Sequence, residues 1–174
     1  VTHLFNGMEP LHHRVPGLVG AALTLDGLRC QLIADGVHVD PVVLKLAYRA
    51  KGPDGLILIT DAMAGTGMPD GRYHLGHTDV VVVGGQARLP EGHLAGSTLT
   101  LDRAVAQMMT AADLPLATAV QMATLTPALA MGWMEAGRLA IGLPADLVLL
   151  DDACRVHITV VGGRVVYEAE ASGA

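Results

Sequence analysis

Apolar and polar positions along the first third of the chain follow the pattern of alternating strands and helices. The apolar run at 28–34 predicts a strand that leads into a polar loop. Asp40 followed by Pro41 is typical of a helix start, and the spacing of apolar residues predicts a helix over 41–51. A nearly all-apolar stretch at 55–59 predicts a strand buried on both faces. Together these elements predict a βαβ unit with parallel strands.

The start of the chain and its middle follow other patterns. The β-branched and aromatic residues of 1–8 predict that the chain begins within a strand. Residues 71–92 contain strand-like runs separated by Gly84-Gly85, which indicates a β-hairpin. This hairpin is expected to be an insertion between the parallel strands and the helices that follow.

The last part of the chain is predicted to be helical and then antiparallel. Four apolar residues share one face of a helix expected near 97–113: Leu101, Val105, Met108 and Ala112. Thr126-Pro127 indicates a further helix start. Three short apolar runs, at 145–151, 155–161 and 164–168, then predict a closing antiparallel unit.

Composition narrows the class of protein. The 174 residues are 51% hydrophobic and 16% charged, which suits a buried parallel sheet covered by helices. A net charge of −6 with sparse Lys and Arg argues against nucleic-acid binding. No run approaches the ~20 apolar residues of a membrane span, so no membrane association is expected. Cys30 and Cys154 form no CxxC pair, which fits a reducing, cytoplasmic setting.

Four short segments could carry chemistry: 2–8, 34–40, 59–65 and 93–100. Three of them place a His or Asp at or just beyond the end of a predicted parallel strand, where reactive groups of α/β sheets gather. Each also has an ordinary structural explanation. Asp61 could cap the loop that follows it, and Ser97 could cap the helix that begins near Leu101. These residues alone predict an α/β domain with polar side chains at the carboxyl ends of its strands. They do not indicate which reaction takes place there.

The order of the motifs is more specific. "THLFNGM", "RVPGLVGA", "IADGVHV", "TDAMAG", "LAGSTLTLDRAV", "MATLTPALAMG" and "GLPADLVLLD" follow one another over the whole chain. In this order they resemble the C-terminal half of the N-acetylglucosamine-6-phosphate deacetylases, a family within the metal-dependent amidohydrolases. The resemblance implies an α/β fold, the C-terminal part of a (β/α)8 barrel from about strand six to strand eight, followed by a small antiparallel β unit. The implied domains are 1–136, with the hairpin near 71–92 inserted, and 137–174.

The resemblance also implies roles for individual residues. His3 corresponds to a metal ligand, and a neutral imidazole suits Zn²⁺ or Fe²⁺. Asp61 corresponds to the general acid and base, and Arg14 to a phosphate-binding arginine that often acts across a dimer interface. The remaining matches are implied substrate contacts: Asn6, Gly7, Asp35, Gly36, Val37, His38, Leu94, Ala95 and Gly96. Gly7 stands where many relatives have Ala, which leaves a backbone contact intact.

The implied reaction is the metal-dependent hydrolysis of N-acetyl-D-glucosamine 6-phosphate to D-glucosamine 6-phosphate and acetate. His38 would polarise the acetamide carbonyl, and Asp61 would take a proton from water and deliver it to the departing amine. The implied cofactor is a divalent metal ion, Zn or Fe, and the implied partner is an amino-sugar phosphate. A homodimer is expected for the complete enzyme.

Two alternatives stay open at this point. Another amidohydrolase, dihydroorotase-like or deaminase-like, would share the strand-end Asp and the closing β unit. A non-catalytic remnant or assembly module is the other alternative, because one His cannot supply the three protein ligands of a catalytic metal. The 174-residue chain is therefore expected to be an incomplete enzyme.

Overall fold

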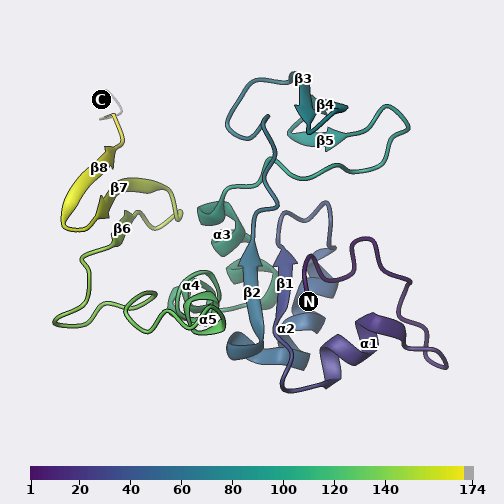
Figure 1. The fold of residues 1–174 in the computed structure, drawn as a ribbon, viewed down its shortest axis with the longest axis horizontal. Coiled ribbons are helices and arrows are strands. Elements are labelled where there is room, and N and C mark those ends of the chain that lie inside the picture. The colour runs from purple at the N-terminus through teal and green to yellow at the C-terminus, as the bar shows by residue number, and fades with distance from the viewer. Residues whose placement is uncertain (171–174) are drawn as a thin grey trace.

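The computed structural model describes residues 1–170 as a mixed α/β arrangement (Figure 1). Its centre is a parallel pair of strands, β1 (Cys30–Ile33) and β2 (Leu56–Ile59), joined through the helix α2 (Pro41–Gly55). The two strands pair in register from Cys30 opposite Leu56 to Ile33 opposite Ile59. Six of the eight residues in the two strands are buried, and Gln31 and Ile59 are partly buried, as expected of short apolar strands in a parallel sheet. The βαβ prediction is confirmed.

Helix α2 begins and ends where the sequence indicates. Asp40 is the N-cap, and its carboxylate accepts a hydrogen bond of 2.8 Å from the backbone N–H of Val42. Gly52, with φ at 62°, interrupts the helical backbone, so the regular helix ends at residue 51. After this kink a short helical turn, residues 53–55, leads into β2.

Four further helices surround this unit: α1 (Gly17–Thr24), α3 (Leu101–Ala112), α4 (Leu116–Ala123) and α5 (Leu125–Ala130). Figure 1 shows α3, α4 and α5 on the β2 side and α1 on the opposite side, near the start of the chain. Side chains from α1 to α4 join those of β1 and β2 in one buried core. No helix within residues 1–170 is both long and apolar enough to cross a membrane.

Two small antiparallel sheets complete the fold. β3 (Gly71–Leu75), β4 (Thr78–Val83) and β5 (Gln86–Arg88) form one of them, and the turn at Gly84-Gly85 joins the last two strands. The hairpin prediction is confirmed there, and the region forms three strands in total. The sheet has its own small core with Met63 and Ala95, which come from the loops beside β2.

β6 (Leu147–Leu150), β7 (Val156–Val161) and β8 (Arg164–Glu168) form the other antiparallel sheet. This confirms the predicted closing unit, which lies apart from the parallel strands in Figure 1. Cys154, between β6 and β7, is buried in the main core, and its thiol lies 3.7 Å from the sulfur of Met109. The expected domain division at 136/137 stays a prediction, and residues 171–174 of that domain lie outside the described residues.

The strand predicted at residues 1–8 is wrong. Residues 1–8 form no regular strand, because the chain turns at 3–7 after only two backbone hydrogen bonds to Gln31. Positive φ values at His3 and Phe5 break the extended conformation. On α3, Val105, Met108 and Ala112 of the predicted face are buried, whereas Leu101 at the start of the helix is 39% exposed. The helix expected at Thr126 begins one residue earlier, at Leu125.

The α2 N-cap gives a test of this part of the fold. Replacing Asp40 with Ala leaves the Val42 N–H without its acceptor and is expected to lower the free energy of unfolding by about 1 kcal/mol. Asp40→Asn keeps an acceptor oxygen and should lose less. Urea denaturation of both variants of the complete protein measures the difference. Equal losses would show that the cap hydrogen bond does not stabilise the helix.

Candidate active site

The in-register pairing of β1 and β2 places two acidic residues at the same edge of the sheet. Ile33 is opposite Ile59 at the ends of the strands, and Asp35 and Asp61 each follow two residues later. The carboxyl ends of parallel strands meet at one edge, which is where α/β folds bind ligands. Both acidic residues therefore belong to one edge of the molecule.

Asp61 is exposed and has a left-handed backbone, with φ at 51°. Its carbonyl accepts a 2.7 Å hydrogen bond from the N–H of Ser97, and the N–H of Met63 donates to the Ser97 carbonyl at 2.9 Å. Ala62 and Ser97 form a parallel β-bridge. This bridge brings the loop at 94–96 beside Asp61.

Asp35 and His38 form a close pair in the loop after β1. The Nδ1 of His38 lies 2.6 Å from Asp35 Oδ2, and the side chains are 6% and 14% exposed, respectively. Asp35 Oδ1 also accepts from the backbone N–H groups of Val37 and His38, both at 2.8 Å. An ionised Asp35 accepts the Nδ1 proton, which leaves Nε2 of His38 as the ring nitrogen that can meet a ligand.

The hydrogen bonds around Asp35 decide its charge. Burial of the carboxyl opposes ionisation, but the hydrogen bonds from the His38 ring and from the backbone of His38 and Val37 outweigh it. They hold the pKa of Asp35 below its usual value. Asp35 is therefore ionised at neutral pH and fixes the orientation of the His38 ring.

A shallow cleft brings several of the predicted substrate contacts together. The loop after β1, the loop at 94–98 and the turn between β4 and β5 form its walls. The lining residues are Asp35, Val37, His38, Gly85, Gln86, Ala87, Leu94, Gly96, Ser97 and Thr98. Sequence reasoning missed Gln86 and Thr98, because the Gly84-Gly85 turn indicates a hairpin and gives no sign that the hairpin reaches this cleft.

Two predicted contacts lie near this cleft without lining it. Ala95 is buried in the small core beneath the β3–β5 sheet, so only its backbone is available to a ligand. Gly36 is exposed with φ at 73°, and a Cβ there would come within 3.2 Å of the Gln107 side chain. Gly36 therefore allows α3 to approach the loop that carries His38.

His3 and its neighbours lie in a tight turn beside β1. The N–H of Leu4 donates to the Gln31 carbonyl at 2.8 Å, which places this turn against the strand. His3 Nδ1 lies 2.8 Å from the carbonyl of Asn6 and donates to it, so Nε2 is left for a ligand. Gly7, with φ at 67°, closes the turn.

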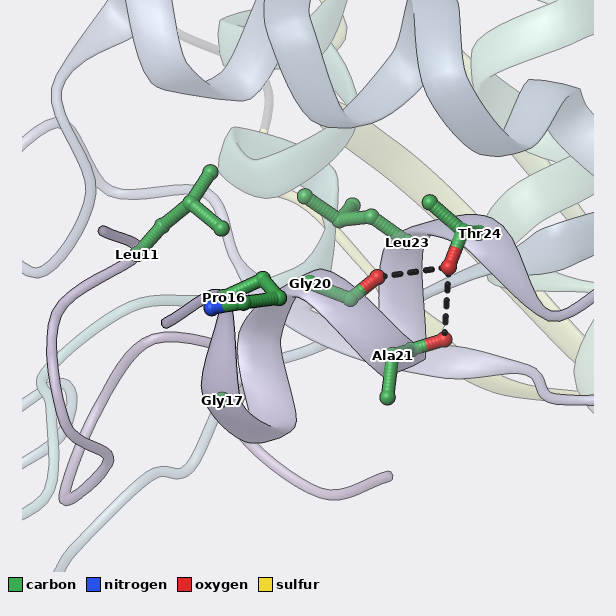
Figure 2. A pocket seen from close by; sticks show the side chains of 7 residues that line it. All are labelled: Leu11, Pro16, Gly17, Gly20, Ala21, Leu23 and Thr24. Atoms are coloured by element: carbon green, nitrogen blue, oxygen red, sulfur yellow. Dashed lines mark hydrogen bonds between the residues drawn. The ribbon is translucent and has the colours of Figure 1, made fainter. Parts of the chain in front are cut away.

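Arg14 is not among the residues that line this cleft. It is exposed in the loop before α1, where His12 and Val15 form an isolated antiparallel bridge. Next to this loop is an apolar groove of about 360 Å³, which α1 and Leu11 form (Figure 2). Its lining carries no titratable side chain, so the groove itself offers no acid–base chemistry. The residues drawn are Leu11, Pro16, Gly17, Gly20, Ala21, Leu23 and Thr24.

The described residues do not form a metal centre by themselves. Within residues 1–170 no group of three or more His, Cys, Asp or Glu side chains is close enough to hold a metal ion. The geometry of His3 alone suits a ligand, since metal-binding imidazoles usually donate their other N–H to an oxygen such as a backbone carbonyl. One imidazole does not make a catalytic site that normally takes three protein ligands.

Comparisons with known proteins show which proteins this chain resembles. The chain is 43% identical over 164 residues to an N-acetylglucosamine-6-phosphate deacetylase from Lysinibacillus sphaericus, covering 94% of this chain and 42% of that protein. It is also 43% identical to an N-acetylgalactosamine-6-phosphate deacetylase from Shewanella sp. (strain ANA-3), covering 97% of this chain and 43% of that relative. The chain thus spans less than half the length of these relatives.

A solved structure shares the fold. It is an Asp→Ala variant of N-acetyl-D-glucosamine-6-phosphate deacetylase from Mycobacterium smegmatis in complex with N-acetyl-D-glucosamine-6-phosphate. The TM-score is 0.91 at 41% identity, over 95% of this chain and 44% of that one. The profile of the amidohydrolase family matches residues 23–166, which include both strands of the parallel pair and the Asp35, His38 and Asp61 positions. This chain therefore belongs to the amidohydrolase family.

Proposed function

We propose that the protein carrying this chain removes the acetyl group from N-acetyl-D-glucosamine 6-phosphate and releases acetate and D-glucosamine 6-phosphate. The observation that carries the proposal is the placement of Asp61 and the Asp35–His38 pair at one edge of the β1–β2 sheet. Relatives with about 40% identity and a solved complex with this substrate support it. They also favour a deacetylase over a dihydroorotase-like or deaminase-like enzyme.

The chain supplies one part of the proposed enzyme. We place β1 and β2 in the C-terminal part of a (β/α)8 barrel, from about strand six to strand eight. Residues 1–170 do not close a barrel themselves. The relatives are more than twice as long as the matched region, and their additional length can hold the other strands.

Asp61 is the group that moves the proton in this proposal. Its carboxylate can accept a proton from the attacking water. The same carboxyl then returns that proton to the nitrogen as the carbon–nitrogen bond breaks, so glucosamine leaves as a neutral amine. Its place on a turn directly after β2 lets a buried strand aim it.

His38 contacts the acetamide in this proposal. Because Asp35 accepts its Nδ1 proton, Nε2 faces the ligand, and in the imidazolium form it donates a hydrogen bond to the carbonyl oxygen. Leu94 and Gly96 lie on the opposite wall of the same cleft and would border the sugar. Asn6 and the backbone of Gly7 would add polar contacts from the turn that carries His3.

A divalent metal ion, Zn or Fe, belongs to the proposal for the complete enzyme. Such an ion supplies Lewis-acid activation of water and of the carbonyl. We propose His3 Nε2 as one ligand, because its other nitrogen already bonds the Asn6 carbonyl. The other ligands would come from the part of the protein outside this chain.

Arg14 is proposed to bind the phosphate across the interface of a homodimer. Its guanidinium can form paired hydrogen bonds to phosphate, and it lies on an exposed loop apart from the cleft. Exposed apolar side chains flank it, with Leu11 at 48%, Val15 at 69% and Leu18 at 54% exposure, and the groove of Figure 2 adjoins them. A cytoplasmic setting fits the buried, unpaired thiols of Cys30 and Cys154.

A second candidate substrate is N-acetylgalactosamine 6-phosphate. A deacetylase of that sugar matches this chain as well as the glucosamine enzymes do. The two sugars differ only in the direction of one hydroxyl, and the groups assigned above act on the acetamide and the phosphate that both share. Measuring kcat/KM for each sugar separates the two candidates.

The first prediction tests the reaction and the role of Asp61. The complete wild-type protein should release acetate from N-acetyl-D-glucosamine 6-phosphate, and Asp61→Asn should lower kcat by about 10²- to 10⁴-fold, because an amide cannot accept the proton. The amount of bound metal should stay unchanged, which elemental analysis measures. Near-normal turnover of Asp61→Asn would contradict the assignment, and so would metal loss in proportion to activity.

The second prediction concerns Arg14. Arg14→Ala should raise KM for the phosphorylated sugar far more than KM for unphosphorylated N-acetylglucosamine, since only the former has the group that the guanidinium binds. Steady-state kinetics with both sugars measures the ratio. Arg29→Ala, on an exposed residue before β1, is the matched control and should change neither KM. Equal effects of Arg14→Ala on both sugars would remove phosphate as its target.

The third prediction follows from the lowered pKa of Asp35. The carboxylate stabilises the fold above the pKa of the unfolded chain, about 3.9, and this contribution is lost as the pH falls through the lower folded-state pKa. Wild type should therefore lose stability more steeply than Asp35→Asn as the pH falls below about 4. Urea midpoints at several pH values measure this. Parallel pH profiles for the two proteins would show that the Asp35 pair does not contribute.

A further inference from the structure

Ser97 is buried beside the backbone of Asp61. Within residues 1–170 two polar side chains fall among the buried residues, Ser97 and Thr126, each 2% exposed. The Ser97 hydroxyl donates to the carbonyl of Thr60, directly before Asp61, and accepts a 3.0 Å hydrogen bond from the N–H of Leu99. One side chain therefore connects the end of β2 to the segment that begins α3.

The backbone of Ser97 adds three bonds to the same turn. Its N–H donates to the Asp61 carbonyl at 2.7 Å, and its carbonyl accepts from the N–H of Met63 at 2.9 Å and from the Thr66 hydroxyl at 3.1 Å. Residues on both sides of Asp61 thus bond to this one serine. The contacts hold the main chain of the turn and leave the Asp61 carboxylate free for another partner.

The turn needs such support because its backbone is unfavourable. Asp61 has φ at 51°, a left-handed conformation that costs a residue other than glycine free energy and persists where the surroundings enforce it. The neighbouring chain also approaches closely, since a Cβ on Gly96 would lie 3.1 Å from the Asp61 carbonyl oxygen. Because Gly96 has no side chain, the two segments can come this close. Ser97, the next residue, then makes its hydrogen bonds to Thr60 and Asp61.

From these contacts we propose that Ser97 is a positioning residue that holds the Asp61 carboxylate in the direction needed for proton transfer. The inference rests on the proposed function of Asp61. Ser97 itself need not touch the reacting atoms. It acts through the main chain on either side of Asp61. It is not simply the cap of α3, because Thr100 is the N-cap of that helix.

Thr126 offers a matched control within the same fold. Its hydroxyl is equally buried and donates to the Pro53 carbonyl at 2.8 Å, just before the start of β2. Ser97 bonds to the carbonyl just after the end of β2. Both side chains therefore bond to main chain next to the same strand, and only Ser97 lies at the end that carries Asp61.

The experiment compares Ser97→Ala, Ser97→Thr and Thr126→Val in the complete protein, with acetate release as the assay. Ser97→Ala should lower kcat by about 10- to 100-fold with KM within about two-fold of wild type, because a misdirected carboxylate slows chemistry and leaves binding intact. Ser97→Thr keeps the hydroxyl and should recover most of kcat. Thr126→Val should keep normal kcat. Ser97→Cys, which keeps the volume with a weaker donor, replaces the Ala variant if that variant does not fold.

A double variant identifies the route of the effect. In the Asp61→Asn background, Ser97→Ala should cause no further fall in kcat if the serine acts through that carboxyl. If the two substitutions lower kcat independently, so that their fold-losses multiply in the double variant, the proposal is overturned. Equal losses of kcat for Ser97→Ala and Thr126→Val would also overturn it.

Hydrogen exchange tests the positioning separately from the reaction. Ser97→Ala should increase exchange at the amides of Met63 and Leu99, while Thr126→Val should leave both protected. If wild type releases no acetate from either sugar phosphate, the proposed function fails, and this measurement alone then decides whether Ser97 holds the Asp61 turn. Unchanged exchange at Met63 in Ser97→Ala would overturn that role.

Discussion

The parallel pairing of β1 with β2 is the constraint on which the candidate site depends. Four residue pairs in register, from Cys30–Leu56 to Ile33–Ile59, align the ends of the two strands. The loops that follow must therefore emerge together, although 26 positions separate Asp35 from Asp61 in the sequence. A shift of the register by one residue would turn every side chain of β2 to the opposite face. Burial of both strands opposes such a shift.

Much of this arrangement could be predicted, because its signals are local. Asp40-Pro41 marks the start of α2, the apolar run of β2 marks a buried strand, and the Gly pairs mark two hairpin turns. The strand expected at 1–8 failed because its composition favours extended chain, while the left-handed backbone at His3 depends on contacts with β1. Positions at or beyond strand ends marked Asp61 and His38 as candidates, but the role of each residue came from the family resemblance.

Contacts between distant segments were the part that sequence could not supply. Nothing near Gln86 indicates that the turn between β4 and β5 reaches the cleft of His38. That placement depends on the small core in which Val80 and Val82 pack with Met63 and Ala95. The same core holds Met63, which is two residues after Asp61. It also holds Ala95, which lies between the cleft residues Leu94 and Gly96. The β3–β5 sheet is thus packed against both loops of the site and does more than extend the surface.

The two buried hydroxyls beside β2 have a consequence for how this region can vary. Ser97 and Thr126 both bond to main-chain carbonyls, those of Thr60 and Pro53. A carbonyl is present whatever side chain its residue carries, so these contacts survive substitution at the accepting positions. They are lost only when the hydroxyl donor is replaced. Among relatives, substitutions should therefore be tolerated more readily at Thr60 and Pro53, which accept through the main chain, than at Ser97 and Thr126, which donate through the side chain.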